Sequence, residues 1–166
     1  MGQTKEARFQ VYVGTYGKYN AGSIAGKWLD LEEYNNKYDF LTACRELHKG
    51  EHDPEFMFQD WEGIPDKYIS ESHIDDEFWT EYLPAVNEHG EELVAAAVAC
   101  DVQIEDINEA YAGQHDSDED FTENLLEEIG DLPKDLPGYI HIDWTWTARE
   151  IMMDYSEDNG YYFRQL

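Results

Sequence analysis

The sequence predicts an α+β fold in three parts: a small α/β domain, a helical middle domain and a second small α/β domain. In the first third of the chain, apolar residues alternate with polar ones and also recur at helical spacing, as in strands packed with a helix. The middle third shows helical spacing alone, and a hairpin signal marks the end. We place the domains at residues 1–62, 63–103 and 104–166.

The first domain is predicted to hold three strands and one helix. Apolar alternation or short apolar and aromatic stretches predict strands at residues 8–15, 27–31 and 55–61. Residues 16–26 are glycine-rich and polar, which predicts a loop. Residues 38–48 carry apolar side chains at helical spacing, and Gly50 stands where a C′ residue would end that helix.

The middle domain is predicted to be helical. One apolar face is formed by Ile74, Phe78, Tyr82 and Val86. Because proline lacks the backbone N–H, we expect Pro84 to kink or split this helix. Residues 92–100 predict a second helix, which is small and apolar.

The last domain begins with a predicted helix at residues 104–111. An amphipathic helix follows at residues 120–129, where Ser117 and Asp120 form a variant of the capping box. Two prolines, at positions 133 and 137, indicate a turn. The pattern at residues 140–153 fits a helix or an extended segment equally.

A β-hairpin is predicted at the end of the sequence. Asn159-Gly160 is a strong two-residue hairpin signal, because both residues tolerate positive φ. Residues 161–164 are then the returning strand.

The net charge of −27 is unevenly distributed. Residues 1–50 hold 7 Lys+Arg and 6 Asp+Glu, whereas residues 51–166 hold 4 and 32. Residues 68–133 contain 20 acids and no lysine or arginine. Adaptation to high salt would acidify the whole surface, so the uneven charge argues against it. Acidic disordered chains have few aromatic residues, whereas this chain has 24 (5 Trp, 12 Tyr and 7 Phe), which argues against disorder. We expect a folded, acidic, soluble protein with a basic partner, and neither nucleic acid nor membrane as a ligand.

The polar first residues and the absence of an apolar run of ~18 residues predict neither a signal peptide nor a membrane span. Cys44 and Cys100 lie far apart in no redox or metal spacing, which fits a reducing compartment. We therefore expect a cytoplasmic protein.

A calcium loop is the strongest metal candidate, and it is incomplete. Asp116, Asp118, Asp120 and Glu127 occupy positions 1, 3, 5 and 12 of an EF-hand count. Phe121 stands where the loop needs glycine, so a helix start is the better interpretation.

Other catalytic and metal motifs are also incomplete. Cys44, His48 and His52 are spaced by four, but no second cluster completes a zinc site. Ala21 and Trp28 stand where a phosphate-binding loop needs glycine and Ser or Thr. We expect no metal, no cofactor and no enzymatic activity.

The acids themselves are the remaining candidates for function. Glu77, Glu81 and Glu88 fall on one stripe of their helix without an intervening lysine. Like charges at this spacing destabilise a helix, which suggests that these carboxylates have a binding function. A compact unit the size of residues 68–133 is about 28 Å across, over which duplex DNA carries roughly 16 charges. The predicted partner-binding surface comprises Glu71, Asp75, Asp76, Glu77, Glu81, Glu88, Glu91, Glu92, Asp101, Glu105, Asp106, Glu109, Asp116, Asp118, Glu119, Asp120 and Glu123.

Two segments resemble a known family. Residues 9–31, FQVYVGTYGKYNAGSIAGKWLDL, resemble the N-terminal signature of the ArdA antirestriction family. Residues 125–139, LLEEIGDLPKDLPGY, resemble the region of its acidic antirestriction motif, with Lys134 as a departure from a purely acidic pattern. The resemblance covers the whole chain in length, charge and three-part order.

The resemblance implies an elongated homodimer from a mobile genetic element that imitates DNA. Such a protein binds the DNA-binding groove of type I restriction-modification enzymes, on their specificity and modification subunits, and blocks restriction of incoming DNA. It also implies that Gly14, Gly17, Gly22 and Gly26 serve turns and that Trp28 serves packing. The motif acids carried onto this chain are Glu127, Glu128, Asp131 and Asp135.

Two alternatives stay open. A general acidic binding protein or chaperone for basic proteins would use the same carboxylates without requiring a particular shape. A calcium module or metal-dependent enzyme would be stabilised by its metal, because a ligand bound by the folded state alone raises stability.

Overall fold

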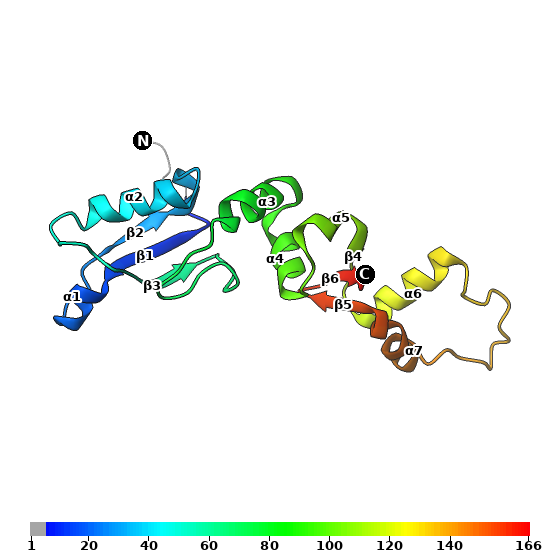
Figure 1. Cartoon of the computed structure of the whole chain (residues 1–166). Helices are drawn as coiled ribbons and strands as arrows, with labels where there is room; N and C mark the ends of the chain where they lie inside the picture. Colours follow the sequence, from blue (N-terminus) through cyan, green and yellow to red (C-terminus); the bar gives the residue numbers. More distant parts are fainter. Residues whose placement is uncertain (1–5) are drawn as a thin grey trace, which may run out of the picture. The chain divides into compact units, whose positions relative to one another are not determined.

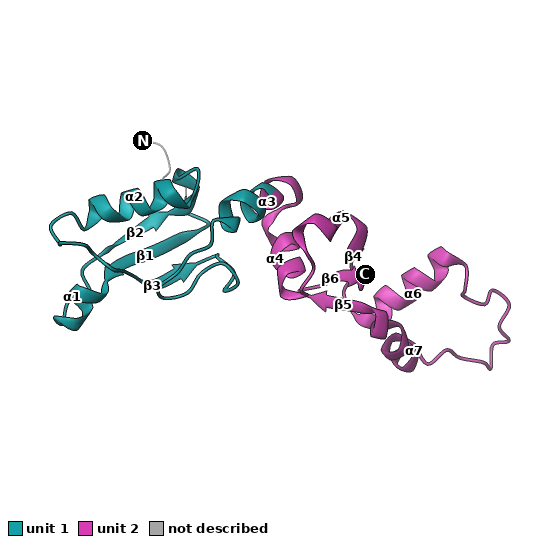
Figure 2. Cartoon of the chain, in the orientation of Figure 1, with its two compact units in different colours: residues 1–84 teal, residues 85–166 magenta. Residues whose placement is uncertain are grey.

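The computed structural model describes residues 6–166, which form two compact units that divide between Pro84 and Ala85 (Figure 2). Each unit contains one three-stranded antiparallel sheet and helices, which confirms a mixed α+β fold. The division into three domains stays a prediction. The polar segment at residues 1–5, used above to argue against a signal peptide, lies outside the described residues.

The first unit is built on the sheet β2-β1-β3 (Figure 1). All three strands were predicted from the sequence, and they span Lys27–Asp30 (β2), Gln10–Thr15 (β1) and Phe56–Glu62 (β3). Helix α2 (Lys37–Leu47) lies along one face, where Val11, Val13 and Phe40 are fully buried. Alternation along β1 therefore separates a buried face from an open one.

Aromatic side chains form much of the core of this unit. Phe9 contacts Phe78 and Tyr82 edge-on, with ring centroids 5.4 and 5.9 Å apart. The indole N–H of Trp79 donates to the Leu31 carbonyl over 3.0 Å, beside the short 3-10 helix η1 (Leu31–Glu33). Large buried rings stabilise a unit whose surface charges oppose compaction.

Three predictions about the first unit are wrong. The 16–26 segment begins with a short helix, α1 (Tyr16–Asn20), which starts because the Thr15 hydroxyl accepts from the Lys18 N–H at 3.1 Å. Helix α2 ends at Leu47 with His48 as its C-cap, so Gly50 is not the C′ residue. Gly14 and Gly17 lie in β1 and α1 and not in turns, although Gly22 has a φ of +88°.

Trp28 packs against the Tyr12 ring, with centroids 5.6 Å apart, but it is not part of the buried core. Its side chain is 37% exposed on the open face of the sheet. Gly26 nearby does serve close approach, because a Cβ there would lie 2.3 Å from the Val13 carbonyl oxygen.

The helix around Pro84 begins later than predicted. Ile74 lies outside it and forms a bridge with Ile69. A π-helical segment η2 (Phe78–Tyr82) runs directly into α3 (Leu83–His89), so Pro84 lies within a continuous helical stretch, just after the change from π to α geometry. Because proline has no N–H to donate, the regular α-helical hydrogen-bond ladder is interrupted at this point of the predicted helix.

The second unit begins with helical elements. The predicted helix at residues 92–100 is confirmed as α4 (Glu91–Ala99). The predicted 104–111 helix is shorter, consisting of the 3-10 turn η3 (Ile104–Asp106) and α5 (Ile107–Ala110). Tyr111 instead opens β4 (Tyr111–Gln114), a strand that the sequence pattern did not predict.

Strand β4 pairs with β6 (Tyr161–Arg164), which pairs with β5 (Tyr155–Asp158) in the order β4-β6-β5. The predicted hairpin is confirmed, because Asn159 and Gly160 have φ values of +50° and +84°.

Helix α6 (Asp118–Ile129) has Ser117 as its N-cap, as predicted, and ends at Gly130 with a φ of +80°. The undecided segment 140–153 contains α7 (Trp144–Ile151), followed by the 3-10 turn η4 (Met152–Asp154). A long loop joins α6 to α7 (Figure 1). Within residues 6–166, no helix combines the length and apolar character needed to cross a membrane.

Candidate functional site

None of the 21 predicted surface and motif acids is buried. Five are partly buried, namely Asp75, Glu91, Asp106, Glu119 and Asp120. The other sixteen are exposed, including Glu77, Glu81 and Glu88 on the helical stretch beside Pro84.

The acids are spread over short helices and helix termini of both units. Glu81 lies in η2, Glu88 in α3, and Glu91 and Glu92 open α4. Asp118, Glu119 and Asp120 form the first turn of α6, where negative side chains are favoured by the helix dipole. Glu123 lies farther along α6. The remaining surface acids lie in loops or other short helices: Glu71, Asp75, Asp76, Glu77, Asp101, Glu105, Asp106, Glu109 and Asp116.

Tyrosine hydroxyls hold three of these carboxylates. Tyr16 donates to Glu71 over 2.9 Å, and Tyr161 donates to Glu92 over 3.1 Å. Each of these bonds raises the pKa of its tyrosine, because a phenolate beside a carboxylate would lose the hydrogen bond and meet a like charge. A neutral donor therefore orders each carboxylate without cancelling its charge.

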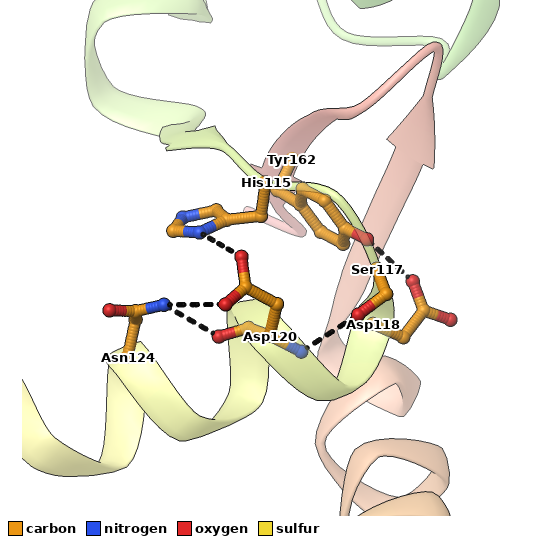
Figure 3. A network of polar contacts seen from close by, with 6 residues as sticks. All are labelled: His115, Ser117, Asp118, Asp120, Asn124 and Tyr162. Carbon is orange, nitrogen blue, oxygen red and sulfur yellow. Dashed lines mark hydrogen bonds and ion pairs between the residues drawn. The ribbon is translucent and has the colours of Figure 1, made fainter.

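The third pair lies at the start of α6, where polar contacts form a small network (Figure 3). Tyr162 on β6 donates to Asp118 over 2.7 Å, and burial followed by this bond raises the tyrosine pKa. The Ser117 hydroxyl accepts from the Asp120 N–H at 3.0 Å. Asp120 also accepts from the Asn124 side chain at 3.3 Å and lies 3.6 Å from the ring of His115.

Other predicted acids contact a backbone N–H or a histidine ring. The Lys37 N–H donates to Asp76 over 3.0 Å. His73 lies 2.6 Å from Asp75, and His89 lies 3.8 Å from Glu88. Across residues 6–166, Glu109 is the one predicted surface acid in an ion pair with arginine or lysine, at 3.7 Å from exposed Arg164. The surface thus keeps nearly all of its negative charge.

The calcium-loop interpretation does not match the local geometry. Asp118 and Asp120 lie in the first turn of α6, and Phe121 is buried against Tyr162 with ring centroids 4.4 Å apart. Within the described part of the chain, no three His, Cys, Asp or Glu side chains are grouped so that they could hold a metal ion.

The four motif acids lie at the end of α6 and in the loop that follows. Glu127 and Glu128 belong to the last turn of α6, whereas Asp131 and Asp135 lie in the loop. All four are exposed, as is Lys134. Large apolar side chains in the same region are also exposed, namely Ile129, Leu136, Tyr139, Ile140, Trp146 and Met153.

A protein-family model described as "Antirestriction protein (ArdA)" matches residues 11–163. The chain belongs to this family. ArdA proteins are inhibitors and not enzymes, which agrees with the lack of a complete catalytic motif in the sequence. A search of curated proteins found no match.

The tyrosines that hold the acids of this ArdA chain have no local signal in the sequence. Tyr16 and Glu71 are 55 residues apart, and Tyr161 and Glu92 are 69 apart. Such pairs are created by tertiary packing, so no local spacing signals them. The hairpin at Asn159-Gly160 was the nearest available indication that a strand carrying Tyr161 and Tyr162 would return here.

Proposed function

We propose that this ArdA protein inhibits type I restriction-modification enzymes by occupying their DNA-binding groove as a DNA mimic. The observation that carries the proposal is a surface of 21 unburied acids, of which one is paired with arginine in the described residues. Tyrosine hydroxyls, an asparagine amide and a backbone N–H order several of these carboxylates while leaving their charge intact.

Charge density supports the same proposal. Duplex DNA carries one charge per ~1.7 Å of axis, so the −27 of one chain equals roughly 13 to 14 base pairs of phosphate. A groove that contacts DNA through lysine and arginine would meet a similar number of negative charges. Two chains would cover about twice that length, which suits the two-part targets of type I enzymes.

We also propose that the protein acts as a homodimer through the segment that follows α6. This segment exposes large apolar side chains, including Tyr139 at 83% and Trp146 at 57%. Large apolar side chains exposed in one region of the chain are typical of a surface that another protein covers. The motif acids lie among these side chains, so the motif would hold two copies together as well as contribute charge.

Restriction of incoming DNA in cells provides the functional test. Unmodified phage is plated on a host with a type I enzyme, with and without this protein, and on a matched host with a type II enzyme. We expect plating to recover on the type I host alone. Equal recovery on both hosts, or recovery with any acidic protein of similar charge, would support a general acidic binder instead.

A further inference from the structure

The open face of the N-terminal sheet carries two aromatic rings among three carboxylates. Tyr12 on β1 lies directly opposite Trp28 on β2 and Asp60 on β3. Gln10, two residues earlier, lies opposite Asp30 and Glu62. Directly paired residues share a face of an antiparallel sheet, so these six side chains form two adjacent rows on the face opposite α2.

The rings are fixed in place and accessible. Tyr12 and Trp28 meet edge-on at 5.6 Å with an angle of 68° between the ring planes. The Tyr12 hydroxyl donates to the Ile24 carbonyl over 2.7 Å, which fixes that ring. Trp28 is 37% exposed, so a flat group has access to its indole from solvent.

The carboxylates on this face carry uncompensated charge. Asp60 and Glu62 are exposed and Asp30 is partly buried. Glu62 accepts from the Gln10 amide at 2.6 Å, a neutral donor. In the described part of the chain, none of the three acids forms an ion pair with lysine or arginine. Lys27 is the register partner of Val13, so its side chain leaves from the opposite face.

We infer that this face binds arginine side chains of a basic segment in a partner protein. A guanidinium group stacks on aromatic rings within about 6 Å of the centroid and pairs with carboxylates in its own plane. Paired residues on neighbouring strands have Cβ atoms about 5 Å apart, so a guanidinium over Tyr12 reaches Asp60. Lysine offers no planar group for this stacking.

Single-stranded nucleic acid is the other ligand that open sheets with exposed aromatic residues bind. Here the three carboxylates would face its phosphates, and this electrostatic repulsion favours the cationic occupant. The inferred site lies outside the predicted acidic surface and goes beyond the proposed function. Its test uses no restriction enzyme, so its failure and the failure of the proposed function are distinguishable.

The first test compares labelled, flexible peptides that carry equal numbers of arginine or lysine, titrated with the full chain at fixed ionic strength. We expect the parent protein to prefer the arginine peptide by about threefold to fivefold, the range of an exposed cation–π contact. Trp28→Thr should abolish this preference, whereas Tyr38→Ala, which removes a 72% exposed ring of α2, should keep it. An unchanged preference in Trp28→Thr would overturn the inference.

A second measurement needs no destabilising variant. The indole N–H signal of Trp28, assigned through Trp28→Phe, is followed by NMR during titration with ethylguanidinium or ethylammonium. The signal should shift with ethylguanidinium and much less with ethylammonium, while Trp61, which pairs with Val11 and hydrogen-bonds Asp66, should stay constant. Equal responses to both cations, or a response to a single-stranded oligonucleotide, would overturn the assignment.

Discussion

The Tyr162 hydroxyl donates a 2.7 Å hydrogen bond to the Asp118 carboxylate, joining strand β6 to the first turn of helix α6. The ring of the same tyrosine stacks on Phe121 with 14° between the planes. One residue therefore contributes to the core of the second unit and also positions an acid of the predicted binding surface.

Tyr162→Phe should separate these two contributions. The stacked ring remains and the hydrogen bond is lost, so the free energy of unfolding should fall by about 1 to 2 kcal/mol. Urea unfolding followed by tryptophan fluorescence measures this change. Asp118→Asn is the matched control, because it removes the charge and keeps an acceptor. A Tyr162→Phe variant as stable as the parent would show that the bond contributes nothing.

Stability should decrease at alkaline pH. Burial raises the pKa of Tyr68 from 10.0 to about 12, and burial likewise raises the pKa of Cys44 from 9.0 to about 12. Folding therefore favours the protonated groups. Their contribution is complete below about pH 9 and is lost as the pH rises toward 12.

Tyr68→Phe should reduce this alkaline loss. The Tyr68 hydroxyl is buried without a hydrogen-bond partner among the described residues, so its removal should not destabilise the protein at pH 7. Free energies of unfolding of the variant and the parent at pH 7, 9, 10 and 11 measure how much of the alkaline loss is due to Tyr68. Parallel pH profiles for the variant and the parent would contradict this account of Tyr68.

Inhibition should depend on many charges and on no single one. Glu81→Gln alone should weaken inhibition less than about threefold, because an exposed charge contributes little by itself in salt. The triple change of Glu77, Glu81 and Glu88 to glutamine should weaken it further. Glu46→Gln, an exposed acid of α2 that pairs with Lys49, is the matched control. Abolition of inhibition by Glu81→Gln in a folded protein would exclude diffuse mimicry.

Association should depend on the exposed rings of the second unit. Trp146→Ser should shift the sedimentation coefficient from that of two copies to that of one, because it removes a large apolar contact from the proposed interface. Tyr38→Ser, at a more exposed ring of the first unit, should leave association unchanged. A parent protein that sediments as one copy at all concentrations would refute the proposed homodimer.

Local signals predicted much of the fold. Asn159-Gly160 predicted the hairpin because both positions require positive φ, and Ser117 predicted the start of α6 because its hydroxyl caps the helix. Strand β4 was missed because its four residues are defined by pairing with β6. Helix α1 was missed because it is five residues long and contains glycine.

The candidate surface was predictable only in part. The sequence indicated that a dense set of acids lacks counter-charges, and the structure leaves none of them buried. It did not indicate which neutral groups order them, because Tyr16–Glu71 and Tyr161–Glu92 come together through tertiary packing. The open position of Trp28 also depends on which face of the sheet α2 covers.

Displacement of DNA from a type I modification core enzyme tests whether this protein occupies the DNA-binding groove. A labelled duplex with the enzyme's target is bound at fixed salt, and this protein is then titrated into the complex. We expect displacement at near-stoichiometric amounts, weakening steeply as salt rises, while an unrelated protein of similar charge stays inert. Retention of the duplex at all concentrations would contradict the proposal that this protein occupies the DNA-binding groove.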